Sequence, residues 1–459
     1  MMRRSILFFM IALFALSASG KKNTWKYRIT LKDKQETTYS LQEPEAFLSL
    51  KAIERRKRQQ LPIDSTDLPV CEAYINAIKH FPIKVVAVGK WDNFVTISCR
   101  DTACIQDIAA LPFVKDTECV WQGEEETAKR RESLINNNST PQEDYYGAAA
   151  RQIKLSNGDK LHEHGFKGKG ITIAVIDAGY HNADKISLLD NVEVLGTKDF
   201  VNPKSDIYAE NHHGLCVFSC MAMNRGNVMV GTAPEASYWL LRSEDNSSEH
   251  LVEQDYWAAA VEFADSVGVD VINTSLGYYE FDDTSKNYNY CHLDGYHALM
   301  SRQASRIASK GMVLVCSAGN AGDDRWKKIT SPADADHVLT VGAINEDGEL
   351  ASFSSVGNTA DGRIKPDVVA LGEQATVVKP DGSVGKANGT SYSSPIMCGM
   401  VACLWQACPT LTAKELIALV RQSADRHICP DNIYGYGIPD VWKAYNTYQM
   451  KHNGSTDSL

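Results

Sequence analysis

From residue 152 onward, the sequence alternates short apolar runs with longer segments of helical periodicity. The run Ile171 to Ile176 is apolar apart from Thr172 and ends at Asp177. Strands this apolar are typical of parallel sheets that helices cover on both faces. The similar runs are Tyr238 to Leu241, Val269 to Asn273, Met312 to Cys316 and Val338 to Ala343. The helices predicted between them are His213 to Met223, Glu249 to Val267, Leu299 to Lys310 and Ser391 to Ala407. We therefore predict an α/β domain of three layers, with a mostly parallel sheet in the middle.

Two polar residues closely follow strands of this predicted sheet. Asp177 ends the first run, and Asn320 closes the segment Ser317-Ala318-Gly319-Asn320 after a later one. Ligands of open parallel sheets bind at the carboxyl ends of the strands. We therefore expect both side chains at the ligand-binding edge of the sheet.

The region before residue 123 has a different pattern of elements. Strands are predicted at Lys26 to Leu31, Ile83 to Val88, Phe94 to Ser98 and Val114 to Trp121, and helices at Glu43 to Gln60 and Ala103 to Ala110, with a further helical turn or two at Tyr74 to His80. The order β, α, β, β, α, β is typical of a small ferredoxin-like α+β unit. The basic run Arg55 to Arg58 is interpreted as a solvated helix face rather than a binding patch or processing site.

The N-terminus has the pattern of an export signal. Arg3 and Arg4 precede the apolar stretch Ile6 to Leu16, and small residues follow up to Gly20. The stretch is too short to span a bilayer, and no later run is long enough for a membrane helix. We predict export by a signal peptide to a periplasm or to the exterior.

These patterns divide the chain into five segments. They are a signal peptide at 1–20, the ferredoxin-like unit at 21–122, a polar linker at 123–150, the α/β domain at 151–449 and a polar tail at 450–459. Exposed polar linkers are common sites of proteolytic cutting, so the linker is the expected processing site.

Charge and cysteine content limit the partners and the cross-links. A formal net charge of -10 provides no overall basic field for nucleic acid, which we do not expect as a partner. Twelve cysteines in an exported chain permit disulfides, but their spacing is not that of a compact framework. We interpret most of them as buried thiols. The sequence leaves open a pairing of Cys99 with Cys119 or of Cys291 with Cys429.

The segment Gly389 to Pro395 places Ser391 at the start of an apolar helix. Such a serine is commonly only a helix cap. Hydrolysis of an amide through serine needs in addition a base, a group that orients the base, and donors for the oxyanion. The chain offers His213 with its neighbour His212 as competitor, Asp177 and Asn320, although each of these also has an ordinary role in a cap, a turn or a loop.

The order of four motifs is the most specific feature of the sequence. The motifs are Asp177-Ala178-Gly179 after an apolar strand, His213-Gly214 opening a helix, Ser317-Ala318-Gly319-Asn320, and Gly389-Thr390-Ser391-Tyr392-Ser393-Ser394-Pro395. In this order they resemble the subtilisin-like serine proteases, the subtilases of peptidase family S8. Supporting matches are Gly231 to Pro234, Ser275 to Gly277, Phe353 to Gly357 and Lys365 to Val368. The resemblance covers about Gln152 to Tyr448.

The resemblance implies a secreted serine endopeptidase that is made as an autoprocessed zymogen. Ser391 would be the nucleophile, His213 the general base and then acid, and Asp177 the group that orients the imidazole. His213 is implied rather than His212 because it is the one that precedes the glycine. The Asn320 side chain and the Ser391 N–H would form the oxyanion hole.

The resemblance also implies how polypeptide substrates bind. The segments Ser275-Leu276-Gly277 and Ser317-Ala318-Gly319 resemble the two that flank an extended substrate and supply main-chain hydrogen bonds. Their small residues leave room for a sizeable side chain before the scissile bond, so we expect a broad, apolar-leaning preference. The N-terminal unit resembles a propeptide, which implies a domain that assists folding and blocks the site until it is cut off between about Trp121 and Ala150.

Two positions depart from the family pattern. Leu215 stands where a threonine is usual, and Ala178 stands where serine or threonine is usual. Neither change removes a reacting group, so we expect activity to be retained. The chemistry requires no cofactor. Calcium is common in the family, but Asn224 to Val230 offers no clear set of carboxylate ligands, and a calcium site stays unassigned.

Other functions fit the sequence less well. A catalytically silent peptide-binding protein on the same fold would lack a reacting group, and none is missing. An esterase elbow would need glycine where Ser393 stands. The glycines between Gly165 and Gly170 precede a strand, whereas a dinucleotide fingerprint follows one. A metal site of His213, Cys216 and Cys220 is disfavoured, because a helix interior with two buried thiols explains this spacing.

Overall fold

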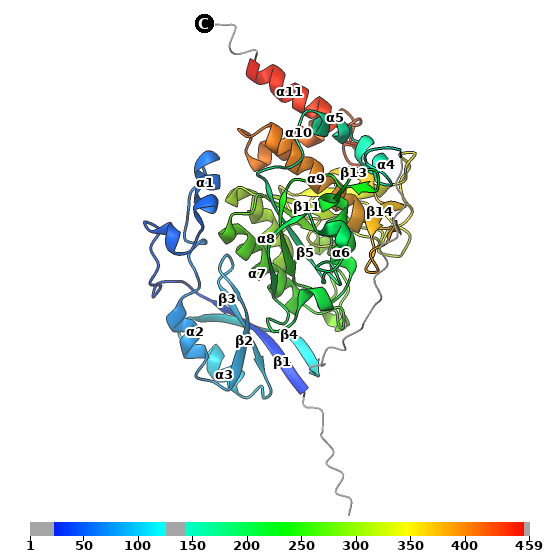
Figure 1. Cartoon of the computed structure of the whole chain (residues 1–459). Helices are drawn as coiled ribbons and strands as arrows, with labels where there is room; N and C mark the ends of the chain where they lie inside the picture. The colour runs from blue at the N-terminus through cyan, green and yellow to red at the C-terminus, as the bar shows by residue number, and fades with distance from the viewer. Residues whose placement is uncertain (1–22, 125–142, 454–459) are drawn as a thin grey trace, which may run out of the picture.

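The computed structural model describes residues 23–124 and 143–453, and these form two domains (Figure 1). The predicted signal peptide and most of the predicted linker lie outside the described residues. The larger domain is built on a seven-stranded sheet with the order β13-β12-β11-β10-β5-β9-β6, in which all neighbouring strands are parallel. Its strands are β5 (Thr172–Asp177), β6 (Glu193–Asp199), β9 (Ser237–Arg242), β10 (Val271–Thr274), β11 (Val313–Ser317), β12 (Leu339–Ile344) and β13 (Val368–Leu371). The predicted three-layer α/β fold is confirmed.

Helices cover both faces of this sheet, and strand β5 shows why. Ile173 and Val175 point to the core shared with α6 and α9, whereas Ala174 and Ile176 point to the core shared with α7 and α8. All four side chains are fully buried, as expected for a strand covered on both faces. The helices of this domain are α4 (Ala150–Lys154), α5 (Gly158–Glu163), α6 (His213–Ala222), α7 (Val252–Val267), α8 (Leu299–Ile307), α9 (Thr390–Ala407), α10 (Ala413–Ser423) and α11 (Val441–Asn453).

The N-terminal domain has a four-stranded antiparallel sheet with the order β2-β3-β1-β4. Its strands are β1 (Asn23–Leu31), β2 (Ile83–Gly89), β3 (Phe94–Cys99) and β4 (Val114–Glu124), and its helices are α1 (Leu50–Arg58), α2 (Glu72–Ile78) and α3 (Cys104–Ala109). This is the strand order of the predicted ferredoxin-like unit. The single helix predicted from Glu43 to Gln60 is shorter, because the turn Pro44–Ala46 precedes Ser49, whose side chain caps α1.

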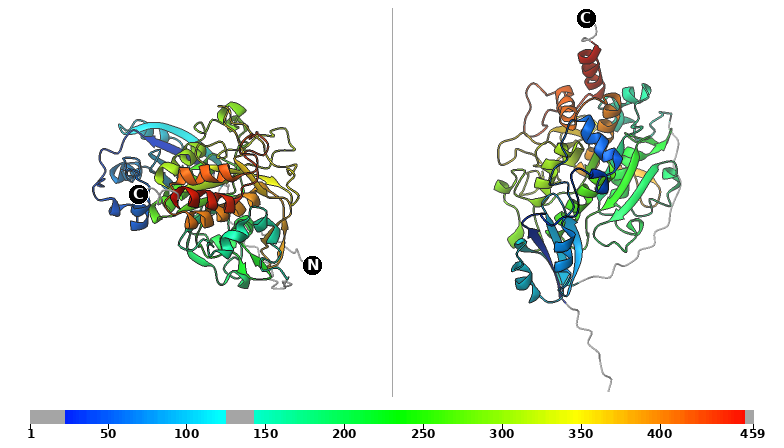
Figure 2. Two further views of the ribbon diagram at one scale, coloured as in Figure 1. Left: turned by 90° about the horizontal axis from the view of Figure 1, so that it is seen from above. Right: turned by 90° about the vertical axis from the view of Figure 1, so that its left-hand side faces the viewer.

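The N-terminal domain packs on the helical layer formed by α7 and α8 (Figure 2). Trp91 and Trp121, which are 3% and 9% exposed, belong to the same apolar core as Tyr256 and Trp257 of α7. The two domains therefore bury a common apolar interface in addition to their own cores.

Several shorter elements escaped the sequence analysis. β6 is an edge strand with a register shift at Val194 to Gly196, and five of its seven residues are exposed, so it lacks an apolar pattern. Two hairpins were also missed, β7 (Asn224–Arg225) with β8 (Met229–Val230) and β14 (Ala375–Val378) with β15 (Val384–Ala387). α11 extends into the segment 450–459 that was predicted as a polar tail.

The interpretation of the basic run at the end of α1 is wrong for half of its residues. Arg55 and Arg56 are only 2% and 1% exposed and form ion pairs with Asp265 of α7, whereas Lys57 is exposed. The sequence pattern could not reveal an acidic partner more than 200 residues away.

Among helices of the described ranges, none is long and apolar enough to cross a membrane.

Candidate active site

Asp177 is the last residue of β5 and lies at the carboxyl edge of the sheet. Its side chain is fully buried, and its Oδ1 accepts a hydrogen bond from the Ala178 N–H at 2.8 Å. The same oxygen lies 2.7 Å from His213 Nδ1. Because a buried carboxylate is costly unless it is paired, this contact with the imidazole compensates the burial.

His213 opens α6, and its position depends on the glycine that follows. A Cβ atom on Gly214 would lie 2.5 Å from the carbonyl oxygen of Gly179 and 2.9 Å from Asp177 Cβ. Only glycine allows the helix to start this close to the end of β5. The His213 N–H donates to Asn211 Oδ1 at 2.7 Å, which fixes the entry into the helix.

The carboxylate partner raises the pKa of His213. Burial alone would lower this pKa, but the charge of Asp177, its hydrogen bond to the ring and the charge of Glu244 together raise it to about 9. The neighbouring His212 differs, since burial and the charge of His213 lower its pKa. The structure therefore pairs Asp177 with His213 and not with the competing histidine.

Ser391 is the second residue of α9 and is 7% exposed. Its Oγ donates to the carbonyl oxygen of Ser275 at 3.4 Å, and no hydrogen bond joins Ser391 to His213 within the described residues. Pro395 lies four residues later in the helix and has no N–H for the Ser391 carbonyl. That carbonyl accepts instead from Ser275 Oγ at 2.9 Å, which ties the first turn of α9 to the end of β10.

Asn320 follows β11 and reaches the same helix start. Its Oδ1 accepts from both the N–H and the hydroxyl of Thr390, each at 2.8 Å. These contacts assign the oxygen of the amide, so Nδ2 is the group left for a ligand. An ideal Cβ atom on Gly389 would lie 3.6 Å from Asn320 Nδ2 and 3.7 Å from the Ser391 backbone nitrogen. The two predicted oxyanion donors therefore border one small space beside Gly389.

The two predicted substrate segments follow β10 and β11, which are neighbours in the sheet. Thr330 lies between them. Its N–H donates to the Ala318 carbonyl at 3.2 Å, and an ideal Cβ on Gly277 would lie 2.1 Å from its Oγ1. Thr330 is 3% exposed, and its hydroxyl has no hydrogen-bond partner in the part of the chain that the structure describes. The space between the segments is thus narrower than their own small residues suggested.

Sequence reasoning also missed Asn273, a polar residue inside the buried strand β10. Its Oδ1 accepts from Ser394 Oγ at 2.8 Å, and its Nδ2 donates to Ser275 Oγ at 3.2 Å. Asn273 therefore holds α9 and the first substrate segment together. An asparagine directly after the apolar pair Val271-Ile272 was the available signal in the sequence.

The residues that the structure describes do not assign a metal site. Within residues 23–124 and 143–453, no three His, Cys, Asp or Glu side chains are grouped as ligands for an ion. All twelve cysteines are free thiols, and Cys216 and Cys220 are buried inside α6. Burial raises the pKa of both thiols.

A parallel α/β sheet whose carboxyl edge presents an aspartate–histidine pair, a serine at a helix N-terminus and two converging N–H donors is the arrangement of a serine hydrolase. The subtilase family model matches residues 168–437, and a propeptide model of the same peptidase family, from Bacteroidota, matches residues 26–137. The chain belongs to the subtilase family, whose members are serine endopeptidases.

Individual relatives agree with this membership. The chain is 30% identical over 301 residues to serine protease AprX of Bacillus subtilis (strain 168), a match that covers 59% of this chain and 65% of that protein. It is 28% identical over 291 residues to subtilisin DY of Bacillus licheniformis, covering 63% and 96%. The structure of the MycP3 protease from the type VII (ESX-3) secretion system superposes with a TM-score of 0.54 at 24% identity, covering 69% and 93%, and so shares the fold.

Proposed function

We propose that the chain is an exported serine endopeptidase that hydrolyses peptide bonds through an acyl-enzyme on Ser391. The observation that carries this proposal is the 2.7 Å contact between His213 Nδ1 and the buried Asp177 Oδ1. It lies at the sheet edge where Ser391 occupies the first turn of α9 and where Thr390 orients Asn320. Family membership supports the same chemistry.

The two ring nitrogens of His213 have different roles in the proposed reaction. Since Asp177 holds Nδ1, Nε2 of His213 takes the hydroxyl proton while Ser391 Oγ attacks the carbonyl carbon. His213 then gives this proton to the leaving amine, and the acyl-enzyme forms. A water deprotonated by the same nitrogen releases the acid product. The long 3.4 Å bond from Ser391 to Ser275 is weak, so the hydroxyl exchanges it readily for His213 when substrate binds.

Two donors and a helix end stabilise the negative charge of the tetrahedral intermediate. Asn320 Nδ2 and the Ser391 N–H border the same space, and this space lies at the N-terminus of α9. Fixed donors of this kind cost no reorganisation during the reaction, and the helix dipole favours an anion there. The proposed chemistry needs no metal ion or organic cofactor.

We also propose that the protein is made as a zymogen and exported. The propeptide match covers the N-terminal domain and extends to residue 137, into the predicted linker. This supports a domain that acts as folding aid and inhibitor and is cut off in the linker by Ser391. Export is supported by the charged, apolar and small-residue pattern of residues 1–20 and by the propeptide itself.

Thr330 supports a preference for small side chains before the scissile bond. It fills the space between the two substrate segments, touching Gly277 on one side and lying 3.0 Å from a Cβ on Gly319 on the other. A large side chain would have to displace a buried residue whose backbone is fixed to Ala318. The proposed substrates are therefore polypeptides cut after small residues, not after the sizeable residues that sequence analysis favoured.

The test is peptide hydrolysis by matched serine variants. Ser391→Ala should lower kcat by about a millionfold, the loss known for the serine of subtilisin itself. Ser393→Ala is the control, because Ser393 lies in the same buried turn and its Oγ donates only to the Thr390 carbonyl within the described residues. Its activity should stay within about tenfold of the parent. Equal activity of Ser391→Ala and the parent would refute the mechanism, and an inactive parent freed of its N-terminal domain would favour a silent peptide-binding protein.

A further inference from the structure

Helix α1 contacts the catalytic domain at a place far from the proposed active site. It stands apart from the four-stranded sheet and from α2 and α3 of its own domain (Figure 1). Its partners in the catalytic domain begin β5, precede β10 and β11 or open α10, so they lie at the amino edge of the sheet. Asp177 ends β5, and Ser275 and Asn320 follow β10 and β11, so these residues lie at the opposite edge.

Arg55 donates to backbone carbonyls at the end of α7 and before β10 and β11. Its guanidinium donates to the carbonyls of Lys310 at 3.1 Å, Asp265 at 3.2 Å and Val269. Carbonyls at a helix C-terminus have no partner within the helix, so a buried cation is favourable there. Arg55 is only 2% exposed, which leaves it no alternative solvation while the domains are joined.

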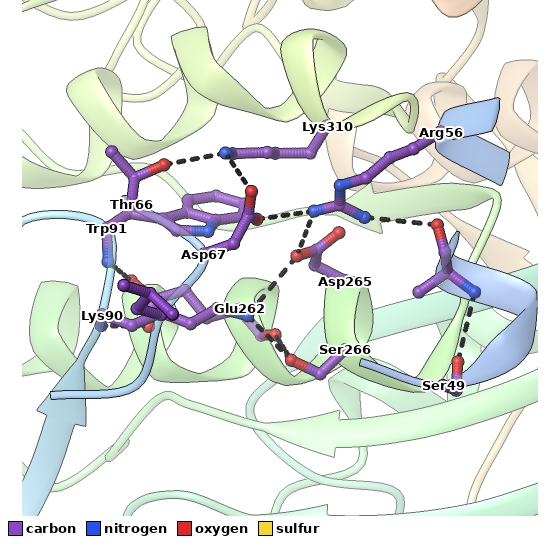
Figure 3. Close-up of polar contacts among 12 residues, drawn as sticks. Ser49, Arg56, Thr66, Asp67, Lys90, Trp91, Glu262, Asp265, Ser266 and Lys310 are labelled. Atoms are coloured by element: carbon purple, nitrogen blue, oxygen red, sulfur yellow. Dashed lines mark hydrogen bonds and ion pairs between the residues drawn. The ribbon is translucent and has the colours of Figure 1, made fainter. Parts of the chain in front are cut away.

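Asp265 lies at the centre of a buried charge network (Figure 3). Its carboxylate is 2.5 Å from Arg55, 2.9 Å from Arg56 and 3.5 Å from Lys90, and all three cations belong to the N-terminal domain. Burial opposes its ionisation, but these charges lower the pKa of Asp265 to about 2. An aspartate in the last turn of a helix is unfavourable on its own. The position of Asp265 at the end of α7 is therefore explained by the cations of the N-terminal domain.

The network continues through residues of both domains. Arg56 also pairs with Asp67 at 2.7 Å, and Asp67 pairs with Lys310 of the catalytic domain at 3.0 Å. Gln59 adds neutral contacts, donating to the Gly311 carbonyl at 2.7 Å and accepting from the Ala413 N–H at 2.9 Å.

A second contact area lies on α7 under the four-stranded sheet. Glu262 accepts from the N–H groups of Lys90 and Trp91 at 2.6 and 2.9 Å. Asp255 accepts from Arg28 Nε at 2.6 Å and from Thr96 at 2.8 Å. The N-terminal domain therefore holds the catalytic domain at two areas, and linked contacts dissociate far more slowly than either alone.

We propose that α1 is an anchoring helix that keeps the N-terminal domain bound after the linker is cut, through Arg55, Arg56 and Asp265. The proposal rests on the proposed function for the cut itself. Cutting the linker alone then leaves a blocked two-chain complex, because separation must break the ion pairs of Asp265 and the buried hydrogen bonds of Arg55 and Gln59 at the same time. Release of the active enzyme requires loss of the α1 contact at the amino edge of the sheet, away from the cleft.

The experiment measures the separation of the two chains and uses the full chain with Ser391→Ala, so its readout does not depend on peptide hydrolysis. A recognition sequence for a site-specific protease replaces part of the segment 125–142. After cutting, the protein is diluted, and the dissociation rate of a fluorescent N-terminal chain is followed. The parent chains should co-elute in size-exclusion chromatography and separate slowly.

Arg56→Ala should speed dissociation at least about thirtyfold, the effect of truncating one partner of a buried charge pair. Lys57→Ala is the matched control, since Lys57 is the next residue of α1 and is exposed, and it should stay within about twofold. Asp265→Asn changes the other side of the contact and should act as Arg56→Ala does, which guards against a folding defect in either variant. The proposal is overturned if both variants dissociate at the parent rate, or if the parent chains separate at once.

Discussion

His213 combines two requirements that act in opposite directions on catalysis. Its pairing with Asp177 fixes the ring, but the negative charges of Asp177 and Glu244 raise its pKa to about 9. A general base must be neutral, and a raised pKa keeps the ring protonated until higher pH. The pair also stabilises the fold in a pH-dependent way. Its contribution to the free energy of unfolding is fully present below about pH 6.5 and is lost as the pH rises through about 9.

This leads to a prediction for the pH profile. The kcat/KM of the processed enzyme should rise with pH along a limb whose apparent pKa is above 6.5. Burial and Asp177 raise the pKa of Glu244 to about 7, which is still below the value of about 9 for His213, so Glu244 is charged over most of that limb. Glu244→Gln should therefore move the limb to lower pH. Glu249→Gln is the control, because Glu249 is not among the charges that act on His213. Identical profiles for the parent and Glu244→Gln would contradict this assignment.

Thr330 provides a prediction for substrate choice. Thr330→Gly should raise kcat/KM for peptides with leucine or phenylalanine before the scissile bond, relative to alanine, by about tenfold or more, because it opens the space between Gly277 and Gly319. Thr330→Val keeps the volume and should leave the ranking unchanged. The measurement is a series of peptides that differ at this one position. A parent that already prefers the large residues would rule out the role given to Thr330.

The residues that sequence analysis identified are those carried by short motifs. Asp177, His213, Asn320 and Ser391 each lie within two residues of a glycine that the local sequence shows, and the structure brings them to one sheet edge. Thr330 and Asn273 were missed because their significance depends on contacts with segments distant in sequence. Residues that react are visible in local patterns, whereas residues that shape or support the site need the three-dimensional contacts.

At the scale of elements, the site depends on how the start of α9 is held. Asn320 joins the loop after β11 to Thr390, and Ser275 joins the end of β10 to the Ser391 carbonyl. Both neighbouring strands thus fix one helix N-terminus. Continuous apolar runs predicted these central strands well, while β6 was missed because an exposed edge strand has no apolar run. The buried face of α1 was missed for a different reason. Its arginines are buried against Asp265 of α7, which is distant in the sequence.

Substitution of Asn320 tests how the loop after β11 contributes to catalysis. Asn320→Leu should lower kcat by about a hundredfold to a thousandfold with little change in KM, because a donor needed only in the transition state is lost. Asn320→Asp keeps an oxygen acceptor for Thr390 but removes the Nδ2 donor, so it should lose kcat as well. Steady-state kinetics of both variants provide the check. A raised KM with unchanged kcat would show that Asn320 binds substrate rather than the oxyanion.

At the scale of the whole molecule, the catalytic edge of the sheet and the α1 contact lie at opposite ends of the same strands. The N-terminal domain spans α7 between them, from Asp255 to Asp265. We propose that this arrangement separates inhibition by the N-terminal domain from the chemistry, since the domain can be retained or released without any change in the residues that react. It also explains why α7 carries buried carboxylates that its own domain does not neutralise in the described structure.

The central claim is that Ser391 is an activated nucleophile. The most direct measurement is the reaction of the processed protein, freed of its N-terminal domain, with a fluorophosphonate probe, followed by mass spectrometry of the labelled peptide. We expect one probe per chain, attached to Ser391, with no labelling of Ser391→Ala and normal labelling of Ser393→Ala. Absence of labelling in the parent, or equal labelling of Ser391→Ala, would contradict it.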